Sequence, residues 1–184
     1  MKQPWDIIKE LESDNSRLKK EAIIKREHQA DNVRFFTGVG ACLDSFRTFG
    51  VQKVPLAIKD VAIGPRLFDD TEFYNVLQRL EDRELTGNDM RNTINNLAGR
   101  CEKDAWNYWY RRILIKDLKC GVTHKTINKH TTMKVPVFEC MLADDSKKHD
   151  KKMTGDVIVE PKLDGVRVIT ICDVEKDEVK MFSR

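Results

Sequence analysis

The stretch DAWNYWYRRILIKDLKCG, from Asp104 to Gly121, sets the fold class that the sequence predicts. Trp106, Trp109 and Tyr110 recur at helical spacing and therefore share one face. Such an aromatic cluster could stack on nucleic-acid bases, but the helical spacing favours packing in a protein core. Gly121 stands where a helix commonly places a glycine, just after its last turn. The stretch therefore predicts a long helix with a buried aromatic face.

Helical periodicity also dominates the sequence before this stretch. Leu18, Ala22 and Ile23 form an apolar stripe on a charged segment. Asp31 and Thr71 each precede an apolar periodic run, so we expect each of them to cap the start of a helix.

The pattern changes after Lys134, where Val, Ile and Thr dominate short apolar runs. Three short strands are predicted in this part, at 156–160, 165–174 and 178–183. The predicted fold is mainly α: an all-helical N-terminal domain, residues 1–131, precedes the first antiparallel strands of a truncated α+β domain, residues 132–184.

The charge of the chain is unevenly distributed. The formal net charge is only +3, which says little about partners. Between Arg100 and Lys134, however, nine Lys and Arg residues stand against three Asp and Glu. This local excess is typical of a surface that binds a polyanion, although a run of charge can also be a solvated helix face.

The five cysteines show neither a C-x-x-C pair nor a histidine at metal-ligand spacing. We therefore expect neither a structural zinc site nor a disulfide framework, and we expect reduced thiols. The N-terminal residues lack the apolar segment of a signal peptide, and no apolar run approaches the length of a membrane span. The sequence thus predicts a soluble cytoplasmic protein without a membrane partner.

Two junctions in the helical part have similar sequences, RELTGNDMRNTI from Arg83 and KDLKCGVTHKTI from Lys116. Each runs basic, acidic, leucine, and then reaches a glycine and the start of a helix. A helix start offers unpaired backbone N–H groups to phosphate. Any helical hairpin needs a turn of this kind, but the matching pair favours contacts with a DNA backbone. The candidate DNA-binding residues are Gly87, Asn88, Lys116, Lys119, Gly121, Thr123 and Lys125.

The segment EPKLDGVR, from Glu160 to Arg167, concentrates charge in a region otherwise read as strand. Asp-Gly is a common hairpin turn, so Lys162 could be a solvent-facing cation. A lysine amine can also attack phosphorus when it is deprotonated and nearby cations neutralise the phosphate. Lys162, Asp164, Gly165 and Arg167 supply these parts together.

K-L-D-G-V-R resembles the K-x-D-G-x-R motif of ATP-dependent polynucleotide ligases and mRNA capping enzymes. Glu160 matches a glutamate of many DNA ligases, and Ser183-Arg184 resembles the start of the next family motif. RELTGN, KDLKCGVT and ECMLA resemble, in order and spacing, segments of T-even phage DNA ligases. The resemblance is weak up to about residue 70 and good from about Arg83. Because capping enzymes and RNA ligases lack the helical domain, the resemblance favours a DNA ligase.

The resemblance implies roles for individual residues. Lys162 would be the nucleophile that takes AMP from ATP, and Glu160 would recognise the adenine amino group. Arg167 and Arg184 would contact the ribose or phosphates. The loop would be shaped by Asp164 and Gly165. Mg²⁺ would bridge the ATP phosphates.

The resemblance also implies a partner and a compartment. The partner would be nicked duplex DNA, bound by a monomer in the cytoplasm of a bacterium or of a phage-infected host. Because the later ligase motifs are not in the sequence, we expect an N-terminal portion of a DNA ligase that binds DNA but does not seal it. The alternatives are a non-catalytic DNA-binding module, another lysine nucleotidyltransferase such as an RNA ligase, and an all-helical interaction protein.

Overall fold

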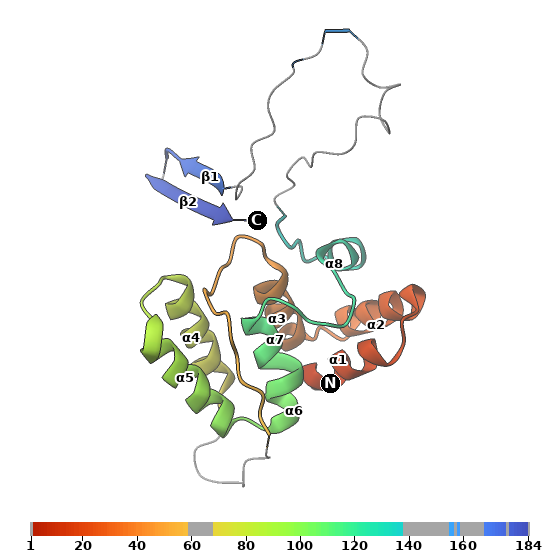
Figure 1. The fold of residues 1–184 in the computed structure, drawn as a ribbon. Coiled ribbons are helices and arrows are strands. Elements are labelled where there is room, and N and C mark those ends of the chain that lie inside the picture. Colours follow the sequence, from red (N-terminus) through yellow and green to blue (C-terminus); the bar gives the residue numbers. More distant parts are fainter. Residues whose placement is uncertain are drawn as a thin grey trace. The chain divides into compact units, whose positions relative to one another are not determined.

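The computed structural model describes residues 2–58, 68–137, 155–156, 158, 168–175 and 177–183. The chain divides into two compact units, Met1–Phe138 and Glu139–Arg184. In the described residues the first unit is helical, and the second contains a two-stranded antiparallel sheet (Figure 1). The predicted fold class, mainly helical with antiparallel strands near the C-terminus, is confirmed.

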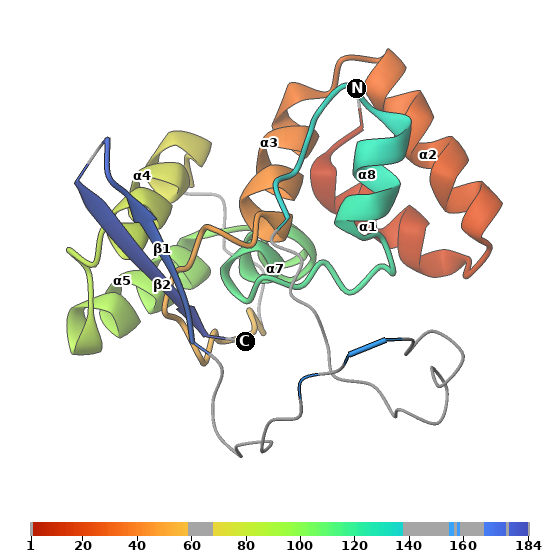
Figure 2. The same ribbon diagram turned by 90° about the horizontal axis from the view of Figure 1, so that it is seen from above.

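The helical unit consists of helices joined mostly by short turns. Their bounds are α1 Pro4–Ser13, α2 Arg17–Gln29, α3 Val33–Leu43, α4 Asp70–Glu81, α5 Gly87–Arg100, α6 Lys103–Ala105, η1 Trp106–Tyr110, α7 Arg111–Leu114 and α8 His124–His130. Figures 1 and 2 show α4 and α5 as a hairpin on one side of α7 and α8 against α2 on the other. The segment 44–58 runs between the hairpin and the central helix (Figure 1).

The central helix carries the aromatic face that the sequence predicts. The elements α6, η1 and α7 follow one another without a break, and η1 is a π-helical turn in which the Arg111 N–H donates to the Trp106 carbonyl. Such a turn adds one residue and so re-aims the side chains on either side of it. Trp106 and Trp109 are 0% exposed and Tyr110 is 1% exposed. The prediction of core packing, rather than base stacking, is confirmed.

Trp109 packs tightly against α3. Its ring stacks on Phe35 with centroids 5.5 Å apart and planes inclined by 20°. Gly38 lies under the same indole, and a Cβ placed on this glycine would clash with Trp109 Cζ2 and lie 2.9 Å from Ile113 Cδ1. The absence of a side chain at position 38 therefore lets α3 approach the central helix.

Two of the expected helix caps are wrong by one or two positions. Asn32, not Asp31, caps α3, and its side chain accepts from the Phe35 N–H, while Asp31 has a φ of 49° outside the helix. At α4 the cap is Asp69, whose carboxylate accepts from the Thr71 N–H. In each case two polar residues compete for the cap, and the local backbone geometry selects one of them.

The apolar stripe expected on α2 is wrong in part: Ile23 packs against the core, but Ala22 is exposed. Leu18 is 77% exposed, whereas Ile24 is fully buried and Glu27 is buried beside it. Glu27 is tolerated there because its carboxylate accepts from Asn32 and from Arg26.

The C-terminal unit contains one hairpin among its described residues. Strands β1 Val168–Asp173 and β2 Glu178–Ser183 pair antiparallel, in a register that runs from Val168 opposite Ser183 to Asp173 opposite Glu178. The strands predicted at 165–174 and 178–183 are confirmed where they are described. The strand predicted at 156–160 lies mostly outside the described residues.

We predict opposite effects of two glycine substitutions in helices. Gly38→Ala should lower the free energy of unfolding by about 1–3 kcal/mol, because the new methyl group overpacks Trp109. Gly99→Ala in α5 is the matched control, since a Cβ there would meet nothing within 4 Å. It should stabilise the helix by about 0.5–1 kcal/mol. Urea unfolding followed by circular dichroism measures both, and a neutral Gly38→Ala would contradict the proposed close approach.

Candidate nucleic-acid interface

The two similar junctions have the same backbone geometry where the preceding helix ends. Arg83 follows α4 with a φ of 61°, and Lys116 follows α7 with a φ of 59°. In the first junction the Glu84 N–H donates to the Arg79 carbonyl over 3.0 Å and the Arg83 N–H to the Leu80 carbonyl over 3.3 Å. In the second, the Asp117 N–H donates to the Arg112 carbonyl over 3.1 Å and the Lys116 N–H to the Ile113 carbonyl over 3.0 Å. This pair of bonds is the Schellman motif, which usually has glycine at the left-handed position. Here both junctions place a basic residue there.

This geometry corrects the predicted end of the central helix. The helix ends at Leu114, and Lys116 takes the left-handed position that the sequence assigned to Gly121. The leucine that follows in each junction anchors the turn, because Leu85 and Leu118 are 4% and 2% exposed. The two junctions therefore share a local structure as well as the order of basic, acidic and leucine residues.

Each junction then presents a glycine and a new helix. Gly87, with a φ of 58°, is the first residue of α5, and Gly121, with a φ of 70°, precedes the start of α8. The N-cap residues Thr86 and Thr123 make no side-chain hydrogen bond to the helices that they begin. Asn88 is exposed, as are both glycines and Thr123. The junctions thus present backbone N–H groups at the surface.

The basic run from Arg111 to Lys125 divides into two groups. Some of its members bind within the fold: Arg111 donates to the Val54 carbonyl, and the buried Arg112 donates to the Leu118 carbonyl over 2.6 Å and pairs with Glu12 over 2.7 Å. Lys119 and Lys125 are exposed and make no side-chain hydrogen bond or ion pair with other described residues. These two lysines are therefore available to an external anion.

Lys116 belongs to the first group. Its ammonium donates to the Ala41 carbonyl over 2.9 Å and to the Asp44 carbonyl over 2.5 Å, at the C-terminal end of α3. A cation there satisfies carbonyls that the helix leaves unpaired. Burial lowers the pKa of Lys116, and the nearby Asp44 carboxylate opposes that shift. The sequence predicts Lys116 as a DNA-binding residue, but its ammonium binds carbonyl groups of the protein backbone.

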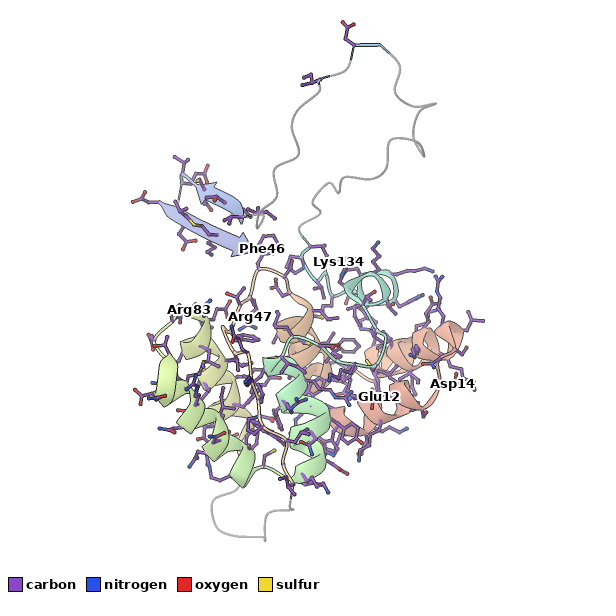
Figure 3. The ribbon with its side chains drawn as sticks, viewed as in Figure 1. Glu12, Asp14, Phe46, Arg47, Arg83 and Lys134 are labelled. Carbon is purple, nitrogen blue, oxygen red and sulfur yellow. The ribbon has the colours of Figure 1, made fainter. Side chains whose placement is uncertain are left out.

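Arg83, the counterpart of Lys116, also contacts the segment after α3. Its guanidinium lies against Gly50 and within 3.4 Å of the Thr48 hydroxyl. Figure 3 shows Arg83 at the end of α4, close to Arg47, which pairs with Glu81 over 2.8 Å. Both left-handed basic residues therefore help to fix the chain between α3 and the α4–α5 hairpin.

The first junction is the less cationic of the two. Its helix α5 carries Asp89 in the first turn, and an anion there would meet this carboxylate. Residues of α5 line a hollow of about 720 Å³, together with the cation Lys53; they include the cation Arg91 and the apolar Ile94. The second junction has no acidic residue in the first turn of α8 and is flanked by Lys119 and Lys125. Phosphate should therefore bind more favourably at the second junction.

The predicted nucleotide-binding residues lie outside the described residues. They are Glu160, Lys162, Asp164, Gly165, Arg167 and Arg184. In the part of the chain that the structure does describe, no group of three or more His, Cys, Asp or Glu side chains could hold a metal ion. No helix among the described residues has the length and apolar character needed to cross a membrane.

The described cysteines differ in their exposure to solvent. Cys42, Cys101 and Cys120 are buried thiols, and Cys172 is an exposed thiol. Burial raises the pKa of both Cys42 and Cys101 to about 12, so these two are protonated at neutral pH.

Comparison with known proteins finds two similar solved structures. No family model and no curated protein matches this chain. Two solved structures, named Pmar-Lig_Pre and Pmar-Lig_PreS3, are each 41% identical to it with a TM-score of 0.79. Both names carry the element Lig, for ligase. This chain is therefore similar to structures whose names indicate a ligase. The alignments cover 100% of this chain and 42% of each of those structures, so it spans less than half their length.

We predict that the two lysines at positive φ in the second junction differ in their effect on stability. Lys116→Met keeps the apolar stem but removes the ammonium that donates hydrogen bonds to two carbonyl oxygens. The free energy of unfolding should therefore fall by about 1–3 kcal/mol. Lys119→Met is the matched control, because Lys119 has a φ of 54° and an exposed side chain. It should change stability by less than about 0.5 kcal/mol. Equal losses in chemical unfolding would contradict the structural role of Lys116.

Proposed function

We propose that this chain is part of an ATP-dependent DNA ligase. Its helical unit would hold duplex DNA by the phosphate backbone, and Lys162 would accept AMP. The observation that carries the DNA-binding part is the pair of matching junctions, each ending in an exposed glycine and an uncapped helix start. Similarity to ligase-related structures and the K-L-D-G-V-R motif support the enzymatic part.

The proposed DNA contacts are electrostatic and independent of base sequence. Backbone N–H groups and lysine ammonium groups bind phosphate oxygens, which every base pair presents alike. Among the predicted residues, Lys119, Gly121, Thr123 and Lys125 lie close together in sequence and are exposed. Lys116 lies between them and the central helix and would act by holding the junction in place. Gly87 and Asn88 would provide a second, weaker contact.

The proposed reaction at Lys162 is a nucleotidyl transfer. The neutral amine attacks the α-phosphorus of ATP, a nitrogen–phosphorus bond forms, and the bond to pyrophosphate breaks. The nitrogen loses its proton to solvent or a base, and pyrophosphate leaves. The AMP then passes to the 5′-phosphate of a nick, and the 3′-hydroxyl displaces it to close the strand. Mg²⁺ would supply charge neutralisation at the ATP phosphates.

We predict that the 184-residue chain binds duplex DNA with a steep dependence on salt. The log of the binding constant should fall with the log of the salt concentration, with a slope of about −0.9 for each phosphate contacted. Lys119→Glu combined with Lys125→Glu should weaken binding and make this slope shallower. Fluorescence anisotropy with a labelled duplex of arbitrary sequence measures both quantities.

A control variant tests whether position or total charge matters. Lys25→Glu combined with Lys103→Glu makes the same change in charge at two lysines outside the junctions. It should weaken binding much less than the junction variant. If the parent chain binds equally well at low and physiological salt, or if both double variants lose the same affinity, the proposed interface is wrong.

We predict a covalent AMP adduct on Lys162 in a ligase that contains this chain. With ATP and Mg²⁺, intact mass should rise by one AMP, and peptide mapping should place the adduct on Lys162. Lys162→Arg should abolish the adduct, because a guanidinium stays protonated and cannot attack phosphorus. The same variant should bind DNA almost as the parent does. An adduct on another residue would refute the assignment of Lys162.

A further inference from the structure

Helix α2 lies against the second junction through α8. Figures 1 and 2 both show α8 along α2, and the contact buries Ile24 of α2 and Ile127 of α8 completely. Polar contacts fix the pair: His130 Nε2 lies 3.2 Å from the Glu21 carboxylate, and the Thr132 N–H donates to the His28 ring over 3.4 Å. The position of α2 relative to this junction is therefore well defined within the helical unit.

Lys20 stands on the same face of α2, one helical turn before Ile24. Its ammonium lies directly over Gly121, because a Cβ placed on that glycine would be 2.9 Å from Lys20 Nζ. Gly121 also has a φ of 70°, which disfavours any side chain. The left-handed backbone thus favours glycine at this position, and the Lys20 ammonium occupies the space where a side chain would begin.

The ammonium of Lys20 makes no hydrogen bond or ion pair with any other residue of the described ranges. The carboxylates around it already have partners. Asp14, at the turn between α1 and α2 (Figure 3), pairs with Lys19, and Glu21 pairs with Arg17. Glu12 pairs with the buried Arg112. Lys20 is therefore a half-exposed cation whose ammonium has no direct ion pair or hydrogen bond among the described residues and lies over a backbone without a side chain.

We propose that Lys20 and Gly121 together form a phosphate contact, so that the DNA-binding surface extends from the second junction onto α2. This inference rests on the proposed DNA binding and adds a residue from a helix about one hundred positions earlier in the chain. One backbone phosphate of duplex DNA would lie between the Lys20 ammonium and the flanking cations Lys119 and Lys125. Gly121 would contribute by leaving the Lys20 ammonium its place over the backbone.

The test is a double-mutant cycle on DNA affinity. Four chains are compared by anisotropy over a range of salt: the parent, Lys20→Ala, Gly121→Ala and the double variant. Lys20→Ala should weaken binding and make the log–log salt slope shallower by about 0.9, the value for one lost phosphate contact. Gly121→Ala should weaken binding in the parent, because the methyl group displaces the ammonium. In the Lys20→Ala background it should weaken binding much less.

Controls separate this inference from the proposed function and from folding. Lys25→Ala removes an exposed lysine from another face of α2, and its affinity and salt slope should equal those of the parent. Thermal unfolding of every variant gives its folded fraction, and Lys20→Gln replaces Lys20→Ala if the latter unfolds. A parent chain that does not bind DNA would overturn the proposed function. A parent that binds, with Lys20 variants of unchanged affinity and slope, would overturn only the phosphate contact on α2.

Discussion

The close contact between Trp109 and α3 fixes the arrangement of the helical unit. A glycine at position 38 lets the indole reach the backbone of α3, and Phe35 stacks on the same ring. One turn earlier on the central helix, the Trp106 indole N–H donates to the Pro55 carbonyl over 2.9 Å and so holds the segment that follows α3. Both junctions contact this region, because Lys116 donates to the Ala41 carbonyl of α3 and Arg83 lies against the segment after α3.

Charge in the second junction serves two separate purposes. Arg112 and Lys116 donate to backbone carbonyls, and this gives the turn a single conformation. Lys119 and Lys125 are then displayed on a backbone that is already fixed. An ordered surface loses less conformational entropy when it binds a partner than a mobile one does. The internal cations therefore contribute to binding indirectly, by holding the exposed ones in place.

Part of the fold can be predicted from sequence where helical or strand periodicity matches burial, although on α2 it does not, because Leu18 is exposed. The aromatic face of the central helix and the hairpin strands follow from residue spacing alone. Helix ends are harder to predict, because Asp31 and Asn32 are chemically equivalent caps and only the backbone angles choose between them. The central helix ends earlier than the sequence predicts because a lysine, Lys116, occupies the left-handed position where glycine is the usual residue.

The candidate site shows the same limit. The similarity of the two junctions is visible in the sequence, because each is a local segment with its own order of residues. The separation of internal from exposed cations is not visible, since Lys116 and Lys119 are neighbours of the same type with opposite environments. Lys20 is distant in sequence from Gly121, and only the packing of α2 on α8 brings the two together.

The distribution of indoles has a practical consequence. All three tryptophans of the sequence, Trp5, Trp106 and Trp109, lie in the unit Met1–Phe138. Two of them have no exposure to solvent, so their emission will shift to longer wavelength when the core opens. Intrinsic fluorescence therefore reports on the helical unit alone. Thermal unfolding followed by tryptophan fluorescence can monitor the helical unit without a contribution from the strands, whether the C-terminal unit is folded or unfolded at that temperature.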